Sequence, residues 1–191
     1  NLTAECWFYC TALTAGTQPR FFLVGSNGTD ALLLQYNVNT TEWVVNFQNS
    51  NVITQAYPIK SGQWYHAAIV RNSGTTNLYI NGVSIANGNN SNSIGSNQFF
   101  VGAINWASDT TYSVTGYITD VRITTSAVYT TTFTPPTAPL TAISNTQVLY
   151  NMTNAGIYDN AMMNDLETVG NAQISTSVVK YGTGSLYFDG N

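Results

Sequence analysis

Charged side chains are scarce in this sequence: they make up 7% of its 191 residues, five basic against nine acidic. The resulting net charge of -4 argues against nucleic acid as a partner, because binding to phosphate requires clustered Lys and Arg. Asn, Thr, Ser and Gly supply most of the polar surface instead, which is typical of extracellular and virion proteins. No apolar run approaches the roughly 18 residues that a membrane-spanning helix needs, so we expect no membrane insertion.

Cysteine and histidine are equally rare. Cys6 and Cys10 lie four residues apart in a strand-like run, where about 13 Å separates them. A disulfide requires Cα atoms within about 7 Å, so we expect two small, buried, free thiols. His66 is the only histidine, and neither a Ser-His-Asp triad nor a multi-histidine zinc site can be built around it. We expect it to be half-buried and hydrogen-bonded.

The chain contains only three glutamates: Glu5, Glu42 and Glu167. Glycoside hydrolysis needs two carboxylates about 5 to 9 Å apart, which a Glu-x-Asp-x-x-Glu strand places on one face, and no glutamate here has partners at that spacing. The sequence therefore predicts a protein without enzymatic activity. We expect Glu5 at a sheet margin. Arg71 and Arg122 each end an apolar strand, where we expect them to cap a sheet edge or to pair with Asp120.

Short apolar runs separated by turn-forming residues fill the chain, and no long stretch has helical periodicity. In the clearest of these, Trp64–Arg71 and Leu78–Ile80 are joined by a turn, and Asn81–Gly82 supplies the dipeptide that a type I′ hairpin requires. The other expected strands are Cys6–Leu13, Arg20–Gly25, Ala31–Val38, Glu42–Phe47, Val52–Ile53, Val83–Ile85, Phe99–Ala103, Gly116–Thr124, Thr146–Tyr150, Ala172–Val179 and Ser185–Phe188. Helical turns are expected only at Ser126–Tyr129 and Asn160–Glu167. The sequence thus predicts an all-β fold, an antiparallel β-sandwich.

Three motifs resemble those of a known family with this type of fold. The hairpin Trp64–Gly82 resembles the laminin-G-like jelly rolls of the concanavalin A-like lectin/glucanase superfamily, and Gly116–Ile123 matches a second motif of that family. The proline-rich segment Phe133–Pro139 looks like the tail of such domains in phage structural proteins. The resemblance covers residues 1–140 and implies a concanavalin A-like jelly roll.

The C-terminal part of the chain resembles the opening, N-terminal strands of the same fold. Lys180–Gly190 resembles the strand that normally opens this domain, upstream of the segment equivalent to Glu5–Phe8. We therefore expect residues 1–140 to be a sandwich lacking its opening strands and residues 141–191 to supply such strands. They could complete their own sandwich, as in a circular permutation, or a neighbouring copy. We favour completion within the chain.

The resemblance also implies function. It indicates a non-enzymatic structural or adhesion module of a phage virion fibre or capsid appendage, extracellular on the virion. Its expected partners are other virion subunits or repeats and a host cell-surface glycan. A carbohydrate-binding module of a secreted cellular protein and a decoration protein without ligand are the alternatives. No cofactor is required, although related domains often hold a structural calcium ion, for which Asp120 and Asp189 occupy the matching positions.

A sugar site needs an aromatic face for stacking together with amide and carboxylate hydrogen bonds. The loop 103–112 offers all three, so the predicted carbohydrate-binding residues are Asn105, Trp106, Asp109 and Tyr112. The other three tryptophans, Trp7, Trp43 and Trp64, lie within strand-like runs and are expected in the core.

Overall fold

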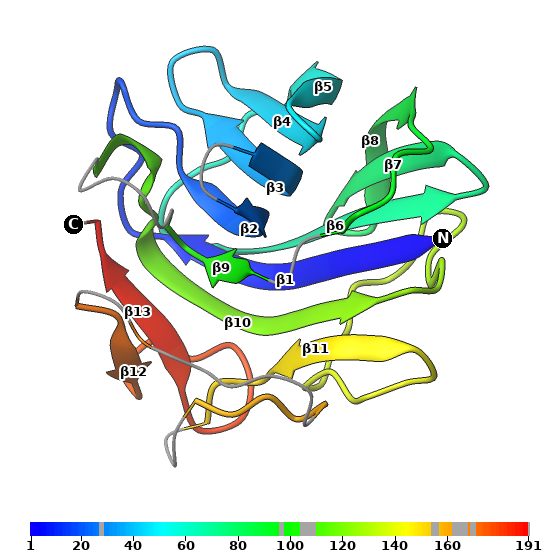
Figure 1. Cartoon of the computed structure of the whole chain (residues 1–191). Helices are drawn as coiled ribbons and strands as arrows, with labels where there is room; N and C mark the ends of the chain where they lie inside the picture. The colour runs from blue at the N-terminus through cyan, green and yellow to red at the C-terminus, as the bar shows by residue number, and fades with distance from the viewer. Residues whose placement is uncertain are drawn as a thin grey trace.

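The computed structural model describes residues 1–26, 29–95, 98–103, 110–153, 157–161, 168 and 171–190, with the backbone alone for residues 26 and 29–31. Within these ranges the chain folds into two packed antiparallel sheets, which confirms the predicted β-sandwich (Figure 1). The one described helical segment is a 3-10 turn, η1 (Thr110–Tyr112). The described residues therefore include no helix able to span a membrane.

The larger sheet, which we call sheet A, has eight strands in the order β12-β13-β10-β1-β6-β7-β8, with β11 also beside β10. These are β1 (Leu2–Cys10), β6 (Trp64–Asn72), β7 (Thr75–Ile80), β8 (Val83–Asn89), β10 (Thr115–Thr124), β11 (Thr146–Tyr150), β12 (Gln173–Ser175) and β13 (Ser185–Asp189). Sheet B has the order β5-β4-β3-β2-β9. Its strands are β2 (Arg20–Ser26), β3 (Thr29–Asn37), β4 (Glu42–Phe47), β5 (Ser50–Ala56) and β9 (Phe99–Val101).

The predicted meander forms β6, β7 and β8. Asn81 and Gly82 join β7 to β8, and both have positive φ, 49° and 80°, as a type I′ turn requires. A side chain on Gly82 would also collide with the backbone carbonyl of Phe133. Sequence-local turn chemistry therefore sets this part of sheet A.

Strands from the last fifty residues join sheet A through β10. The first half of β10 pairs with β13, from Thr115 opposite Asp189 to Ile118 opposite Leu186, and its second half pairs with β11. Between the two halves lies Asp120, a non-glycine residue with φ of 50°, at a register shift between β1 and β10. Figure 1 shows β13 and β11 one after the other along the same edge of β10. Strand β12 is shorter than the predicted run Ala172–Val179.

The core between the sheets is rich in aromatic rings. Phe8 of β1 lies 4.2 Å from Phe21 of β2 and 5.7 Å from Trp43 of β4, centroid to centroid, and all three are fully buried. Such pairs contribute about 0.5–1.5 kcal/mol each beyond their buried area. Cys6 and Cys10 point into the same core as free, buried thiols, as predicted.

We call the face of sheet A that points away from sheet B the outer face. Residues 125–140, which we call the strap, cross this outer face. Tyr129 and Phe133 of the strap stack with centroids 3.7 Å apart and pack with a small second cluster that includes Ala68 and Tyr79. The strap therefore gives part of the outer face a hydrophobic cover.

The helical turn predicted at Ser126–Tyr129 is wrong. The hydroxyl of Thr3 on β1 donates to the carbonyl of Ser126 and accepts from the backbone N–H of Val128. These two bonds hold the strap's backbone extended against β1 instead of in a helical turn. The second predicted turn, Asn160–Glu167, falls mostly outside the described residues.

Candidate functional site

Four aromatic side chains lie in one line across the outer face of sheet A. Trp64, Tyr9, Tyr117 and Tyr187, on β6, β1, β10 and β13, stand directly opposite one another in the strand register. Their ring centroids are 5.6, 5.9 and 5.4 Å apart in that order. We call these four residues the aromatic row. It runs perpendicular to the strands.

The two-residue alternation of strands places the aromatic row on the outer face. Phe8 and Cys10, on either side of Tyr9, belong to the core cluster, so Tyr9 points away from it. All four rings are partly exposed. Trp64 begins β6, and its neighbour Tyr65 takes the core position, so the prediction that Trp64 lies in the core is wrong.

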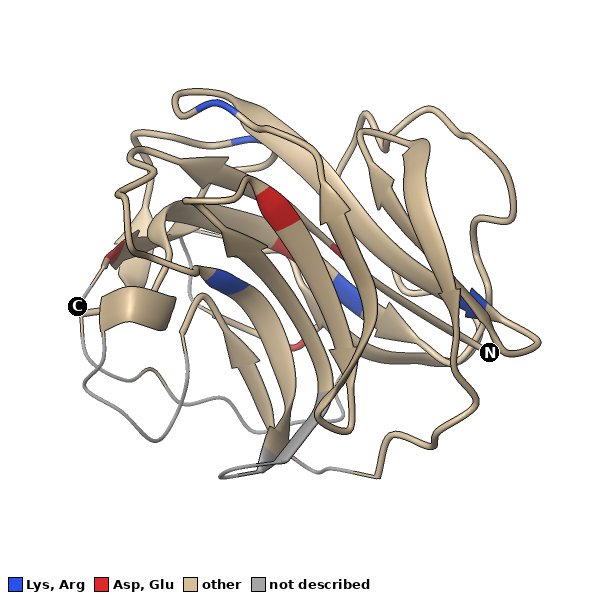
Figure 2. Ribbon diagram, turned by 90° about the horizontal axis from the view of Figure 1, so that it is seen from above, with Lys and Arg blue, Asp and Glu red and all other residues tan. Residues whose placement is uncertain are grey.

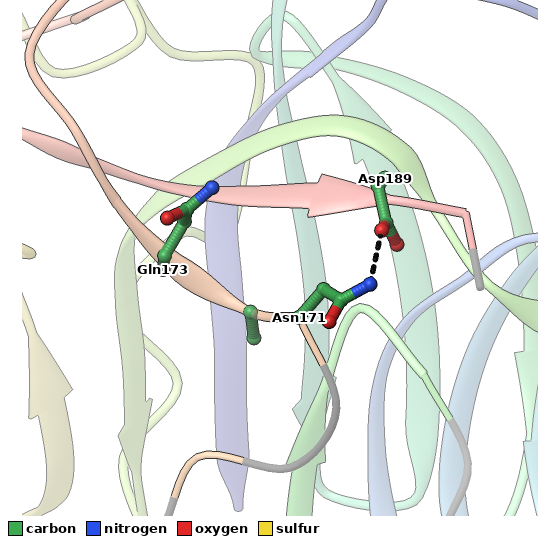
Figure 3. Close-up of a pocket in the computed structure, with 4 residues that line it drawn as sticks. Asn171, Gln173 and Asp189 are labelled. Carbon is green, nitrogen blue, oxygen red and sulfur yellow. Dashed lines mark hydrogen bonds between the residues drawn. The ribbon is translucent and has the colours of Figure 1, made fainter.

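A polar flank borders the aromatic row on one side. Asp189 lies two residues beyond Tyr187 on β13 and therefore shares its face, opposite Thr115 of β10. Gln173 of β12 stands directly opposite Tyr187 and continues the line of the row. The side-chain amide of Asn171 donates to Asp189 Oδ2 at 2.7 Å (Figure 3). Asn171, Gln173 and Asp189 are thus polar groups at the Tyr187 end of the row.

These three polar side chains and Ala172 line an open cavity of about 350 Å³. Figure 3 shows Asn171 and Asp189 pointing toward each other beside β13, with Gln173 farther along β12. The cavity adjoins the Tyr187 end of the aromatic row because Gln173 pairs with Tyr187 in the register. It presents amide donors, amide acceptors and one carboxylate.

The other side of the aromatic row is a ridge formed by Lys180 and Tyr181. The Lys180 ammonium lies 4.0 Å from the centroid of the Trp7 ring, and Tyr181 meets the same ring edge-on at 6.0 Å. Tyr181 also donates its hydroxyl to the Pro136 carbonyl of the strap at 2.6 Å. The prediction that Trp7 lies in the core is wrong, because Trp7 is buried under this ridge on the outer face. Trp43 lies in the core, as predicted.

An ionic cluster centred on the fully buried Glu5 lies beneath the strap. Glu5 Oε1 accepts from Arg122 Nε at 2.9 Å and from Nη2 at 2.6 Å. Glu5 Oε2 accepts from the Tyr129 hydroxyl at 2.8 Å and from His66 Nε2 at 3.1 Å. Burial raises the pKa of Glu5, but His66, Arg122 and the Tyr129 hydroxyl outweigh it, so the pKa lies below its ordinary value.

This cluster corrects three predictions. Glu5 is at the centre of sheet A and not at its margin, because β1 lies between β10 and β6. Arg122 pairs with Glu5 rather than with Asp120 or at a sheet edge. His66 is hydrogen-bonded as predicted, but it is fully buried rather than half-buried. Every member except Tyr129 is buried, and both carboxylate oxygens of Glu5 accept hydrogen bonds. Through the hydrogen bond from Tyr129, the cluster attaches the strap to sheet A.

The two aspartates that the sequence matched to calcium ligands lie far apart. Asp120 is five residues from Thr115, the partner of Asp189, which corresponds to about 16 Å along β10. Asp120 Oδ1 accepts from the backbone N–H of Leu140 and from the Asn151 amide. Burial raises its pKa above the usual range, against these hydrogen bonds. The described residues include no group of three or more His, Cys, Asp and Glu able to hold a metal ion. Calcium binding stays a prediction.

Of the predicted sugar-binding residues, Asn105, Trp106 and Asp109 lie outside the described residues. Tyr112 ends η1, and the Arg20 guanidinium lies 4.4 Å from its ring centroid. The prediction for this loop therefore stays a prediction. The sequence did not point to the aromatic row, although one signal was present: Tyr9 and Tyr187 each sit between two residues whose side chains belong to the core.

The chain is similar to several solved structures. A candidate carbohydrate-binding protein from Bacteroides ovatus superposes over 97% of this chain with a TM-score of 0.63 at 15% identity, and the chain spans 51% of that protein's length. Domains LG4-5 of mouse laminin α1 match 64% of this chain and 34% of theirs (TM-score 0.49, 18% identity). A heptameric pentraxin from Limulus polyphemus matches 64% of this chain and 62% of its own (TM-score 0.48, 16% identity).

No curated protein matches the sequence significantly. Residues 1–132, however, match the Laminin_G_3 family model. The chain therefore belongs to the Laminin_G_3 family of the concanavalin A-like lectin/glucanases superfamily.

Proposed function

We propose that this chain is a non-enzymatic module that binds carbohydrate on the aromatic row. The observation that carries the proposal is the alignment of four partly exposed rings, Trp64, Tyr9, Tyr117 and Tyr187, in one line across sheet A. The C–H faces of a sugar ring stack on aromatic faces, while its hydroxyls need polar partners close by. The polar flank of Asn171, Gln173 and Asp189 supplies such partners.

The carboxylates favour binding over hydrolysis. Glycoside hydrolysis uses two carboxyl groups about 5–9 Å apart that face the sugar. Glu5 is fully buried, and Glu42 lies on β4 in sheet B, where the Thr40 hydroxyl donates to it. Asp189 is the one carboxylate among the described residues that borders the aromatic row.

Attachment to a virion is the finer part of the proposal. The motif Phe133–Pro139 resembles the tail of such domains in phage structural proteins, and the chain has few charges and many Asn, Thr, Ser and Gly residues (Figure 2). As part of a fibre or capsid appendage, next to other virion subunits, the module would hold the particle to a host-surface glycan. Mass spectrometry of purified virions should detect the chain. If the chain is absent from the virions, a carbohydrate-binding module of a secreted cellular protein becomes the better assignment.

The similarity to a candidate carbohydrate-binding protein of Bacteroides ovatus agrees with the sugar-binding part of the proposal in either setting. A glycan array probed with the whole chain tests it directly. We expect binding that Tyr9→Ala and Tyr117→Ala reduce strongly, while Tyr117→Phe, which keeps the ring, binds like the parent. Tyr158→Ala is the matched control, because Tyr158 is 58% exposed and lies outside the aromatic row.

The array also includes Trp106→Ala. Loss of binding in this variant, with the Tyr9 and Tyr117 variants unaffected, would move the site to the loop 103–112 and refute the role of the aromatic row. A chain that binds no glycan at all would leave a purely structural role. Thermal unfolding of each variant shows whether a loss of binding reflects a loss of fold.

A further inference from the structure

We infer that the ligand of the aromatic row is an extended, uncharged oligosaccharide chain that lies across the strands, from Trp64 to the cavity at Asn171, Gln173 and Asp189. This inference rests on the proposed function and adds the length, direction and charge of the ligand. It follows from three features of the outer face: the length of the row, its two borders and the charges beside it.

The length of the row exceeds what one sugar needs. Adjacent centroids are 5.4 to 5.9 Å apart, and the four strands span three inter-strand spacings, or about 14 Å. A single pyranose ring covers one or two of these aromatic rings. To bury all four, the ligand must continue from strand to strand, and Gln173 extends the same line by one strand.

The borders give the ligand its direction. Trp7 precedes Tyr9 by two residues on the same face, and the Lys180 ammonium stands 4.0 Å above the Trp7 ring. On the opposite side, Thr115 and Asp189 form the next line of outward-facing residues. A ridge on one side and polar groups on the other leave a strip that follows the aromatic row. A linear chain fits it better than a ligand that branches over the ridge.

The charges beside the row favour an uncharged sugar. Asp189 places a carboxylate at the Tyr187 end, where the Asn171 amide holds it, and the whole chain carries a net charge of -4. A uronic or sialic acid would bring a second carboxylate against Asp189. The ammonium group of Lys180, on the ridge, lies over the Trp7 ring and not over the aromatic row, and burial lowers the pKa of Lys180.

The positions of the exposed aliphatic side chains disfavour a protein partner for the aromatic row. Protein interfaces also use Tyr and Trp, but they combine them with other apolar side chains in a buried centre with a polar rim. The exposed aliphatic side chains among the described residues, Val83 and Ile143, begin β8 and precede β11, away from the aromatic row.

Isothermal titration of the whole chain with linear β-linked oligomers of glucose, mannose, xylose and N-acetylglucosamine, one to six sugars long, tests the inference. For at least one series, affinity should rise about tenfold from the disaccharide to the tetrasaccharide and then level off. Tyr187→Ala, at the β13 end of the aromatic row, should lower tetrasaccharide affinity about fivefold and leave the disaccharide less affected. Tyr187→Phe and Tyr158→Ala should match the parent.

The outcomes separate the inference from the proposed function. A monosaccharide that binds as tightly as a tetrasaccharide, at a site that the Tyr117→Ala variant abolishes, overturns the extended ligand and leaves glycan binding in place. Tighter binding of sialylated or uronic oligomers overturns the assignment of charge. If neither these oligomers nor the glycan array shows any binding, the proposed function itself fails.

Discussion

Replacing Glu5 by glutamine removes a negative charge from the centre of sheet A while keeping the shape of the side chain. The carboxylate is fully buried and accepts four hydrogen bonds, two of them from Arg122, which is 5% exposed. In the variant, the Arg122 guanidinium stays buried and loses its counter-ion. The new amide N–H₂ group also faces donors, because the Tyr129 hydroxyl and His66 Nε2 both point at Glu5 Oε2.

The cost follows from the burial. Removing one partner of a buried ion pair destabilises a protein by about 3–5 kcal/mol, because the remaining charge is left without compensation. At a urea dependence of about 2–3 kcal/mol per M, the upper part of the usual range and the part expected for a chain of this length, this corresponds to a midpoint about 1–2.5 M lower. The double variant Glu5→Leu/Arg122→Leu leaves no unpaired charge at this pair and should be less destabilised than Glu5→Gln alone.

The pH dependence has a defined sign. The folded-state pKa of Glu5 lies below its ordinary value of 4.5, so the carboxylate contributes stability that is fully present above the unfolded-state pKa. This contribution is lost as the pH falls through the folded-state pKa. The difference in stability between the parent and Glu5→Gln should therefore be constant from pH 7 to about pH 5.5 and shrink below about pH 4.5.

Urea unfolding followed by tryptophan fluorescence measures both effects. The control is Glu42→Gln, since Glu42 is only partly buried and its described hydrogen bond comes from the Thr40 hydroxyl; we expect a change within about 0.5 kcal/mol. A Glu5→Gln variant that unfolds at the parent's urea concentration would show that the cluster does not hold the strap. A pH profile parallel to that of the parent would refute the lowered pKa.

Three further predictions concern the sandwich. A Cβ on Gly88 would lie 2.2 Å from the Val52 carbonyl oxygen, whereas one on Gly95 would meet nothing within 4 Å, so Gly88→Ala should lower stability by about 1–3 kcal/mol in thermal unfolding and Gly95→Ala should not. Burial raises the pKa of Cys10 to about 12, and Cys6 is also fully buried, so neither thiol should react with a disulfide reagent at pH 8 until urea unfolds the chain; rapid reaction of the native protein would contradict this. Tyr129→Phe removes the hydroxyl that donates to Glu5 and should cost about 1.5–3 kcal/mol in urea unfolding, and an unchanged midpoint would count against the strap's attachment.

Local patterns predicted the meander well. Trp64–Arg71 became β6 (Trp64–Asn72), and Asn81–Gly82 became the turn into β8, because turn chemistry and strand propensity act within a few residues. Glu42–Phe47 and Thr146–Tyr150 match β4 and β11 to the residue. Family resemblance added the jelly roll. The boundary at residue 140 stays a prediction, although β13 pairs with β10 of the same chain.

The pairing of strands that are distant in the sequence determines the candidate site, and the sequence alone did not predict this pairing. Glu5 and Arg122 are 117 residues apart, and only the pairing of β1 with β10 places them opposite each other. The same pairing aligns Tyr9 with Tyr117. In the sequence these appear as isolated aromatic residues in strands, and such residues are usually assigned to a core. The faces of β1, β10 and β6 follow from their pairing, which periodicity alone does not give.

The aromatic row depends on both ends of the chain. The strap covers the outer face over Glu5, and Lys180 and Tyr181 cover the next line of residues, that of Trp7. The line of Tyr9, two lines beyond Glu5, stays partly exposed. Strand β13 then adds Tyr187 to the row and Asp189 to its flank. Residues before 125 thus supply three of the four rings, whereas the C-terminal strands supply the fourth ring and the polar cavity. Since the extra strands lengthen the binding strip as well as the sheet, a chain that lost β12 and β13 would lose the polar end of its site together with the core side chains of Leu186 and Phe188.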